Sequence, residues 1–195
     1  AQKIDLHQVP DDLRQTIDTV LEVACYRSIF ERGVEVIHKF DPAFNNPRLS
    51  IAFDKYRVSQ ILVNILSNAA KFTHQGKIVL STKLLEIQKE TSDISGHIAT
   101  IQFSIADTGI GMEHTFLDQI GTPFVQYKKT SEGTGLGLVI VKALTSLMNG
   151  TFSVTSQKGI GSTFAITLKL PAILEEEFEH ERFNLLQLLP SIRPS

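Results

Sequence analysis

The chain has 195 residues, of which 42% are hydrophobic and 21% charged, the balance of a soluble globular domain. A net charge of -2 excludes the basic surplus of proteins that bind nucleic acid through its phosphates. Cys25 is the single cysteine, so no internal disulfide is possible; we expect a small buried side chain in a cytoplasmic protein. No run of about 18 apolar residues occurs, which predicts no membrane contact by this segment and leaves open an anchor elsewhere in a longer parent protein.

The first elements in chain order are two helices with a strand between them. Apolar residues recur at helical spacing over residues 10–31, and Gly33 follows as a stop signal. Residues 48–53 alternate as a short strand, and Asp54 then stands where a helix cap is expected. The second helix is predicted over residues 55–73.

The rest of the chain is rich in strands. The segment 89–96 is polar and predicts a hairpin loop, residues 107–137 form a long glycine-containing loop, and residues 138–148 predict a third helix that stops at an Asn-Gly pair. Alternation and β-branched residues predict four further strands, over 77–88, 97–106, 151–156 and 162–170. The pattern favours an α/β two-layer sandwich, in which a mixed, mainly antiparallel sheet packs on about three helices.

This pattern divides the chain into three parts. Residues 1–47 form an N-terminal helix and lead-in, residues 48–171 form the core, and residues 172–195 change in composition after Pro171. We interpret this last part as a linker or docking helix.

The second predicted helix carries a polar face beside its apolar stripe. Asn64, Asn68 and Lys71 are spaced by four and three residues, about 110° from the stripe. Two carboxamides and an ammonium group there could hold a hydrated magnesium ion and a phosphate. A solvated polar surface is the alternative explanation of this face.

Two glycine-containing segments point to the same kind of ligand. In SIADTGIGM, Asp107 ends a strand just before Gly109 and Gly111, and its carboxylate could accept a hydrogen bond from an exocyclic amine. An ordinary Asp-Gly turn explains that segment equally well. In EGTGLGL, three alternate glycines lead into a helix, whose free N–H groups are suited to phosphate; the spacing is that of neither a dinucleotide fingerprint nor a Walker A loop.

Five motifs in this order resemble the ATP-binding catalytic domain of sensor histidine kinases, with its Bergerat (GHKL) fold, over residues 48–170. The motifs are NILSNAAKFT, DTGIGM, TPFVQ, GTGLGL and GIGSTF. The third departs from the common form of its motif, because Gly121 precedes its Thr-Pro-Phe.

The resemblance implies ATP and Mg²⁺ as ligands, and a role for each matching residue. It implies that Asn68 is the magnesium ligand with Asn64 beside it, that Lys71 contacts a phosphate, and that these three serve catalysis. For the base, it implies contacts of Phe72, Asp107, Gly109, Ile110, Gly111, Met112 and Thr163. For the phosphates, it implies Gly133, Thr134, Gly135, Leu136, Gly137 and Leu138. Phe124 is implied as the anchor of a mobile lid, roughly residues 125–132, within which Lys128 and Lys129 fall.

The acceptor histidine of this family is absent from the chain. His180 precedes Glu181 and Arg182, but it follows the domain and the pattern breaks afterwards, so we interpret it as a surface residue. The resemblance therefore implies a separate dimerisation domain, in a parent that is a homodimer and passes phosphate to a response-regulator receiver domain. Two alternatives are an ATP-driven conformational switch of the GHKL ATPase type and a degenerate ATP-binding regulatory module. Asn64 disfavours the switch, because related hydrolases carry a glutamate base there.

Overall fold

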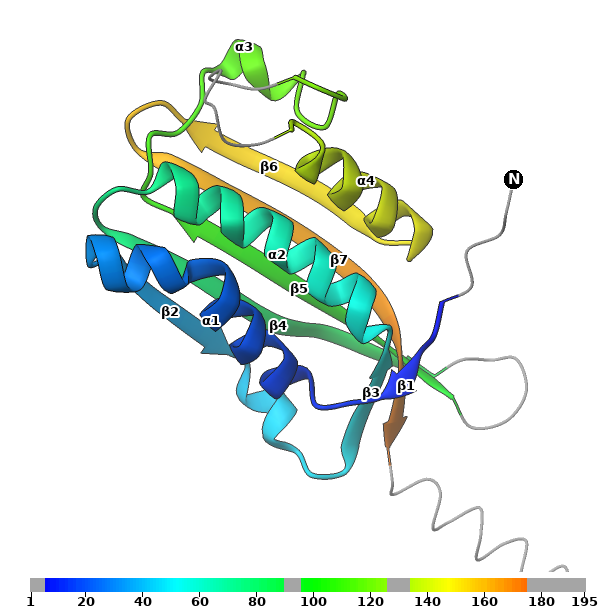
Figure 1. Ribbon diagram of the computed structural model, residues 1–195. Coiled ribbons are helices and arrows are strands. Elements are labelled where there is room, and N and C mark those ends of the chain that lie inside the picture. Colours follow the sequence, from blue (N-terminus) through cyan, green and yellow to red (C-terminus); the bar gives the residue numbers. More distant parts are fainter. Residues whose placement is uncertain (1–5, 90–95, 126–133, 175–195) are drawn as a thin grey trace, which may run out of the picture.

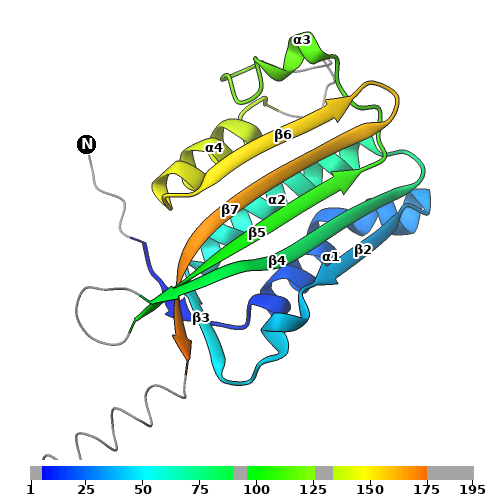
Figure 2. The ribbon, with the colours of Figure 1, turned by 180° about the vertical axis from the view of Figure 1, so that it is seen from behind.

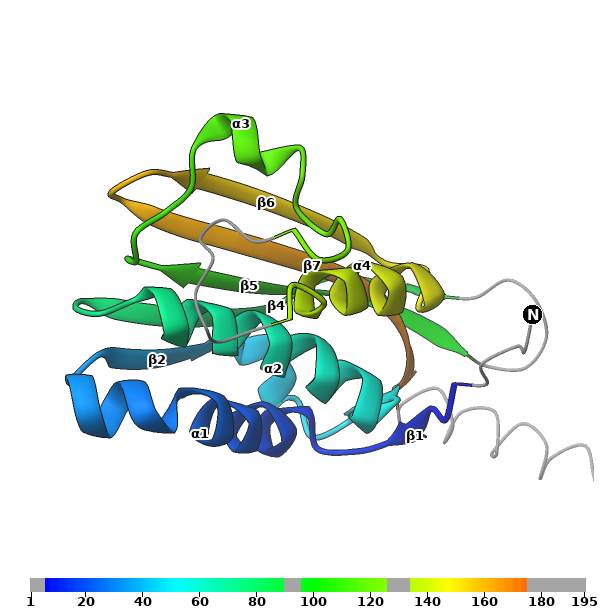
Figure 3. The ribbon, with the colours of Figure 1, turned by 45° about the horizontal axis from the view of Figure 1, so that its top comes forward.

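The computed structural model describes residues 6–89, 96–125 and 134–174, and these form two layers (Figure 1). One layer is a seven-stranded sheet of order β1-β3-β7-β5-β4-β2, with β6 paired to β7. The other layer consists of helices α1, α2 and α4, which all lie on one face of the sheet (Figure 3). From behind, the opposite face is seen with none of the described helices upon it (Figure 2).

The sheet is antiparallel except for one pair. Its strands are β1 (Val9–Pro10), β2 (Glu35–Phe40), β3 (Leu49–Phe53), β4 (Lys77–Lys89), β5 (His97–Asp107), β6 (Thr151–Gln157) and β7 (Gly161–Leu174). The edge strand β2 runs parallel to β4. The long strand β7 pairs with β5 along one side, and with β6 and then β3 along the other.

The helices bury apolar stripes against this sheet. They are α1 (Leu13–Arg32), α2 (Lys55–Phe72) and α4 (Gly137–Leu147), with a short α3 (His114–Leu117) and a 3₁₀ turn (Pro42–Asn45) outside the main layer. Helix α2 lies at the centre, between α1 and α4, and buries Ile61, Leu62 and Ile65 almost completely. The N-terminus of α2 lies beside β1 and β3, and its C-terminus lies at the opposite end of the sheet.

Asp54 anchors the start of α2. One carboxylate oxygen accepts a hydrogen bond from Arg57 N at 3.1 Å, and the other accepts from His7 N at 3.1 Å. The first contact caps the helix. The second attaches the segment that leads into β1. Because the side chain is buried, these two backbone N–H groups take the place of water as donors to its oxygens.

The predicted fold class is confirmed: a mixed, mainly antiparallel sheet lies on three helices. The predicted helices lie within three residues of the observed ones at each end, and Cys25 is buried as expected. The sequence analysis missed β1, β2 and α3.

The strand predicted over 162–170 continues through Pro171 to Leu174. Between the β6 pairing, which ends at Thr167, and the β3 pairing, which begins at Ala172, one side of β7 has no strand partner in the part of the chain that the structure describes. The missing N–H of Pro171 can face this gap without loss of a ladder hydrogen bond.

Candidate functional site

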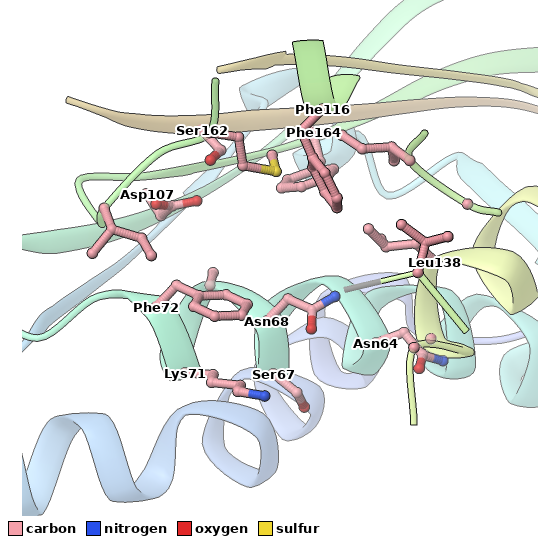
Figure 4. A pocket seen from close by; sticks show the side chains of 18 of the residues that line it. Asn64, Ser67, Asn68, Lys71, Phe72, Asp107, Phe116, Leu138, Ser162 and Phe164 are labelled. Atoms are coloured by element: carbon pink, nitrogen blue, oxygen red, sulfur yellow. The ribbon is translucent and has the colours of Figure 1, made fainter. Parts of the chain in front are cut away.

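A cavity of about 270 Å³ opens at the end of the sheet that lies away from β1 and β3. Its walls come from the C-terminal half of α2, the ends of β5 and β7 that meet there, the segment around α3, and the start of α4 (Figure 4). The residues that line it are Asn64, Ser67, Asn68, Ala69, Lys71, Phe72, Asp107, Ile110, Gly111, Met112, Phe116, Ile120, Gly121, Val125, Thr134, Gly135, Gly137, Leu138, Ser162 and Phe164.

Helix α2 supplies two carboxamides to one wall. Asn64 and Asn68 are one turn apart on the same helix face, and Phe72 follows one turn later. The Asn64 amide nitrogen donates to the Gln60 carbonyl at 2.7 Å. This leaves the Asn64 Oδ1 towards α4, where a Cβ added at Gly137 would lie 2.9 Å from it. Asn64 therefore presents an acceptor oxygen where α2 and α4 approach each other.

Asp107 provides a buried carboxylate at the opposite end of the cavity. Its Oδ1 accepts a hydrogen bond from Gly109 N at 2.8 Å. Burial raises the pKa of Asp107, while the backbone amides of Gly109 and Ser162 act in the opposite direction. No basic side chain is among the causes of this shift, so the carboxylate remains available as an acceptor for a ligand that donates.

The loop after Asp107 depends on two glycines for its path. A Cβ at Gly109 would lie 2.5 Å from the carbonyl oxygen of Phe72. At Gly111, where φ is +58°, a Cβ would lie 1.9 Å from the carbonyl oxygen of Gln157. A side chain at either position would therefore meet the protein's own backbone, so the loop can take this path only with glycine there.

The start of α4 faces the cavity without a side-chain cap. Leu136 occupies the cap position, no side chain there accepts from the helix, and the first turn contains no acidic residue. The N–H groups of a helix's first turn have no partner within the helix, and they carry a partial positive charge. Gly137 and Leu138 bring this end to the cavity wall, where an anion could bind.

The remaining wall is largely apolar. Phe164 from β7 and Phe116 from α3 lie together opposite α2 (Figure 4), and Ile120 and Val125 also line the cavity. Lys142 of α4 donates to the Ile120 carbonyl and so holds this segment against the helix.

The cavity brings together twelve of the seventeen binding residues that the resemblance implies. They are Asn64, Asn68, Lys71, Phe72, Asp107, Ile110, Gly111, Met112, Thr134, Gly135, Gly137 and Leu138. Gly109 and Leu136 support the walls without lining them. Phe124 is 75% exposed with φ at +64°, and its backbone packs against Gly135.

Thr163 is not among the residues that line the cavity. Successive side chains of a strand point to opposite faces. Ser162 and Phe164 take the cavity face of β7, so Thr163 points to the other face of the sheet. Ser162, the residue before Thr163 in the GIGSTF motif, lines the cavity, and alternation along the predicted strand, read back from a buried Phe164, points to it.

Several other lining residues were also missed by sequence reasoning. Ser67, Ala69, Phe116 and Ile120 gave no signal, because they are ordinary residues of a helix or loop. Gly133 and residues 126–132 of the lid, with Lys128 and Lys129, lie outside the described residues, as do residues 175–195, which include His180. Within the described residues, no helix is long and apolar enough to cross a membrane.

Comparison with known proteins gives one family match and many relatives. Residues 53–172 match the family described as histidine kinase-, DNA gyrase B-, and HSP90-like ATPase. The chain is 34% identical to hybrid signal transduction histidine kinase B of Dictyostelium discoideum, over 86% of this chain and 8% of that protein. It is 36% identical to the autoinducer 2 sensor kinase/phosphatase LuxQ of Vibrio parahaemolyticus, over 85% of this chain and 19% of that protein.

A solved structure agrees with these relatives. Full-length ShkA in complex with AMPPNP superimposes with a TM-score of 0.70 at 30% identity, covering 89% of this chain and 33% of that one. The chain thus spans only a small part of the curated relatives that it matches, 8% of the first and 19% of the second. With its fold, its cavity and this match over residues 53–172, the chain belongs to the histidine kinase-, DNA gyrase B-, and HSP90-like ATPase family and is the ATP-binding catalytic domain of a sensor histidine kinase.

Proposed function

We propose that this domain binds Mg-ATP with the base at Asp107 and the phosphates at the start of α4, and donates the γ-phosphate to a histidine on a separate dimerisation domain. The observation that carries the proposal is that the two ends of the cavity differ in charge. Asp107 is the sole carboxylate among the described lining residues, and the uncapped start of α4 lies at the other end beside two carboxamides. A ligand with a donor group on a ring and a polyanionic tail matches both ends.

The residues present suit a magnesium ion that is shared with a nucleotide. No cluster of three or more His, Cys, Asp or Glu side chains that could hold a metal occurs in the described parts of the chain. Magnesium prefers oxygen ligands, and in nucleotide sites it is held by one or two protein groups together with phosphates and water. We assign Asn68 as its ligand, with the Asn64 oxygen alongside. When bound, the ion neutralises charge on the phosphates during transfer.

The chemistry of the transfer requires little covalent participation from this chain. A histidine nitrogen attacks the γ-phosphorus, the bond between that phosphorus and the β–γ bridging oxygen breaks, and ADP leaves. The first-turn amides of α4 and the Lys71 ammonium hold the phosphates in position. Asn64 cannot remove a proton from water near neutral pH, so among the described lining residues hydrolysis has no base at the phosphate end.

Phosphate labelling tests this proposal. The chain alone, incubated with γ-labelled ATP, should neither label itself nor release phosphate quickly. Addition of the dimerisation domain of the same parent should yield acid-labile phosphohistidine on the added polypeptide alone. Stable label on this chain, or rapid release of free phosphate from it, contradicts the proposal.

The metal assignment has a test of its own. Asn68→Ala should abolish the gain in nucleotide affinity that magnesium produces, because the ion loses its assigned protein oxygen on α2. Lys71→Ala should have a smaller effect, since an ammonium acts as a point charge without strict geometry. Calorimetric titration of both variants with ADP, with magnesium and with EDTA, measures the difference.

At the level of the parent protein, we propose a homodimer in which the phosphohistidine then serves a response-regulator receiver domain. The relatives support this proposal through their names, which include a hybrid signal transduction histidine kinase. A membrane anchor elsewhere in that parent would be compatible with it.

A further inference from the structure

Ser156 on the edge strand β6 makes three polar contacts beside the cavity, although it does not line it. Its hydroxyl oxygen lies 2.8 Å from Met112 N, 3.0 Å from the Gly161 carbonyl oxygen and 3.0 Å from the Ser162 hydroxyl oxygen. Met112 and Ser162 both line the cavity. Ser156 therefore connects two parts of the wall through one partly buried hydroxyl.

The donors and acceptors in this group allow one arrangement that satisfies every contact. A serine hydroxyl has one hydrogen and two lone pairs. Met112 N–H can only donate, so it occupies one lone pair of Ser156. The Gly161 carbonyl can only accept, so it takes the Ser156 hydrogen. The third contact is then possible only if Ser162 donates its own hydrogen to the remaining lone pair of Ser156.

This arrangement gives the Ser162 hydroxyl a fixed polarity. Its hydrogen points to β6 and away from the cavity, so only its lone pairs are left for a ligand. Ser162 lies beside Asp107, since the two residues are paired across β5 and β7 and the Ser162 amide acts on the Asp107 carboxylate. Figure 4 shows both at the same end of the cavity. Two acceptors thus stand side by side where the base is proposed to bind.

We propose that Ser156 is a positioning residue that sets base specificity: by holding Ser162 as an acceptor, it makes this end of the cavity select a ring with an exocyclic amine over a ring with an oxo group. The inference rests on the proposed placement of the base at Asp107. An amine donates to such a pair of acceptors, whereas an oxo group faces them without a donor. A bridging water does not relieve the mismatch, because its two hydrogens are used by Asp107 and Ser162.

The change Ser156→Ala frees the hydrogen of Ser162. That hydroxyl can then rotate and donate into the cavity, so the penalty against an oxo ring decreases. We expect the ratio of ADP affinity to inosine diphosphate affinity to fall about tenfold, the size expected when one unsatisfied polar contact is relieved. These two nucleotides differ at ring position 6, where one carries an amino and the other an oxo group, and at the neighbouring N1, which is an acceptor in adenine and carries a hydrogen in hypoxanthine.

The experiment is calorimetric titration of the full chain with each diphosphate at constant magnesium. Ser153→Ala is the matched control, because Ser153 is an exposed residue of the same strand and should leave the ratio unchanged. Ser162→Ala should also lower the ratio, and adding Ser156→Ala to it should lower the ratio no further. If Ser156→Ala does not fold, Ser156→Cys replaces it, since a thiol is only a weak acceptor and should lower the ratio in the same direction.

The possible results separate the inference from the proposed function. If Ser156→Ala weakens both nucleotides equally, or if the unchanged chain binds both equally well, Ser156 has only a structural role and the inference is overturned. An additional fall of the ratio in the double variant overturns it as well. If the unchanged chain binds neither nucleotide, the proposed function is wrong, and the inference that rests on it is overturned with it.

Discussion

Replacing Gly111 by alanine should be among the most damaging single changes in this domain. The residue has φ at +58°, a conformation that costs an alanine about 1–2 kcal/mol. The new Cβ would also lie 1.9 Å from the Gln157 carbonyl oxygen, where ordinary contact begins at about 3.4 Å. Two backbone segments must therefore separate by about 1.5 Å, and forcing extra volume into a packed site costs about 1–3 kcal/mol more. We expect the free energy of unfolding to fall by about 3 kcal/mol.

Gly33 offers the matched control for this prediction. Its φ is +65°, but nothing lies within 4 Å of an added Cβ. Gly33→Ala therefore carries the backbone strain without the clash, and a more ordered unfolded state offsets part of that strain, leaving about 1 kcal/mol. In urea unfolding at an m-value of about 2 kcal/mol/M, the midpoints should fall by about 0.5 M for Gly33→Ala and about 1.5 M for Gly111→Ala. Equal shifts for the two variants would refute the reasoning, because strain alone would then explain both.

The further predictions concern three ionisable groups. Asp107→Asn should weaken ADP binding at least about tenfold in calorimetry without lowering the unfolding free energy at neutral pH, because a raised pKa means that burial disfavours the ionised carboxylate. For the same reason, ADP affinity of the unchanged chain should fall as pH decreases through this raised pKa. Asp54→Ala should lower the unfolding free energy by about 2 kcal/mol in urea titration, since it removes the hydrogen bonds to both Arg57 and His7; a loss too small to measure would contradict that role. Burial raises the pKa of Cys25 to about 11, so iodoacetamide at pH 8 should label it only after unfolding, as mass spectrometry can detect.

The helices were predictable because each carries local signals that the fold does not override. Helix α2 has an apolar stripe and a capping Asp54, and the structure uses both. Strand β2 was missed for the opposite reason. Its residues Glu35–Phe40 include His38 and Lys39 on a half-exposed edge, so neither alternation nor a continuous apolar run appears, and its strand conformation depends on the parallel pairing with β4.

The residues of the site can likewise be divided into those that the sequence indicates and those that depend on the tertiary fold. Asn64, Asn68 and Asp107 could be singled out in the sequence because they stand in motifs that resemble a known family, and the structure places all three at the cavity. Ser162 and Phe116 were missed because their positions depend on which strand face, and which loop, the tertiary fold turns towards α2. The contact of Ser156 with Met112 joins residues 44 positions apart in the chain, and no local pattern encodes such a separation.

The course of β7 has a practical consequence for attaching other groups to the domain. From Ser162 at the cavity to Leu174 the strand advances about 40 Å, at the usual rise of about 3.3 Å per residue. Leu174 pairs with Leu49 of β3, and β3 also holds β1, so the described chain enters and leaves at the same end of the sheet. A fluorophore or surface tether placed near Leu174 is therefore separated from the cavity by the length of this strand, and one placed near Val9 by most of it. Such a label should be suitable for measuring nucleotide binding on an immobilised domain without obstructing the opening.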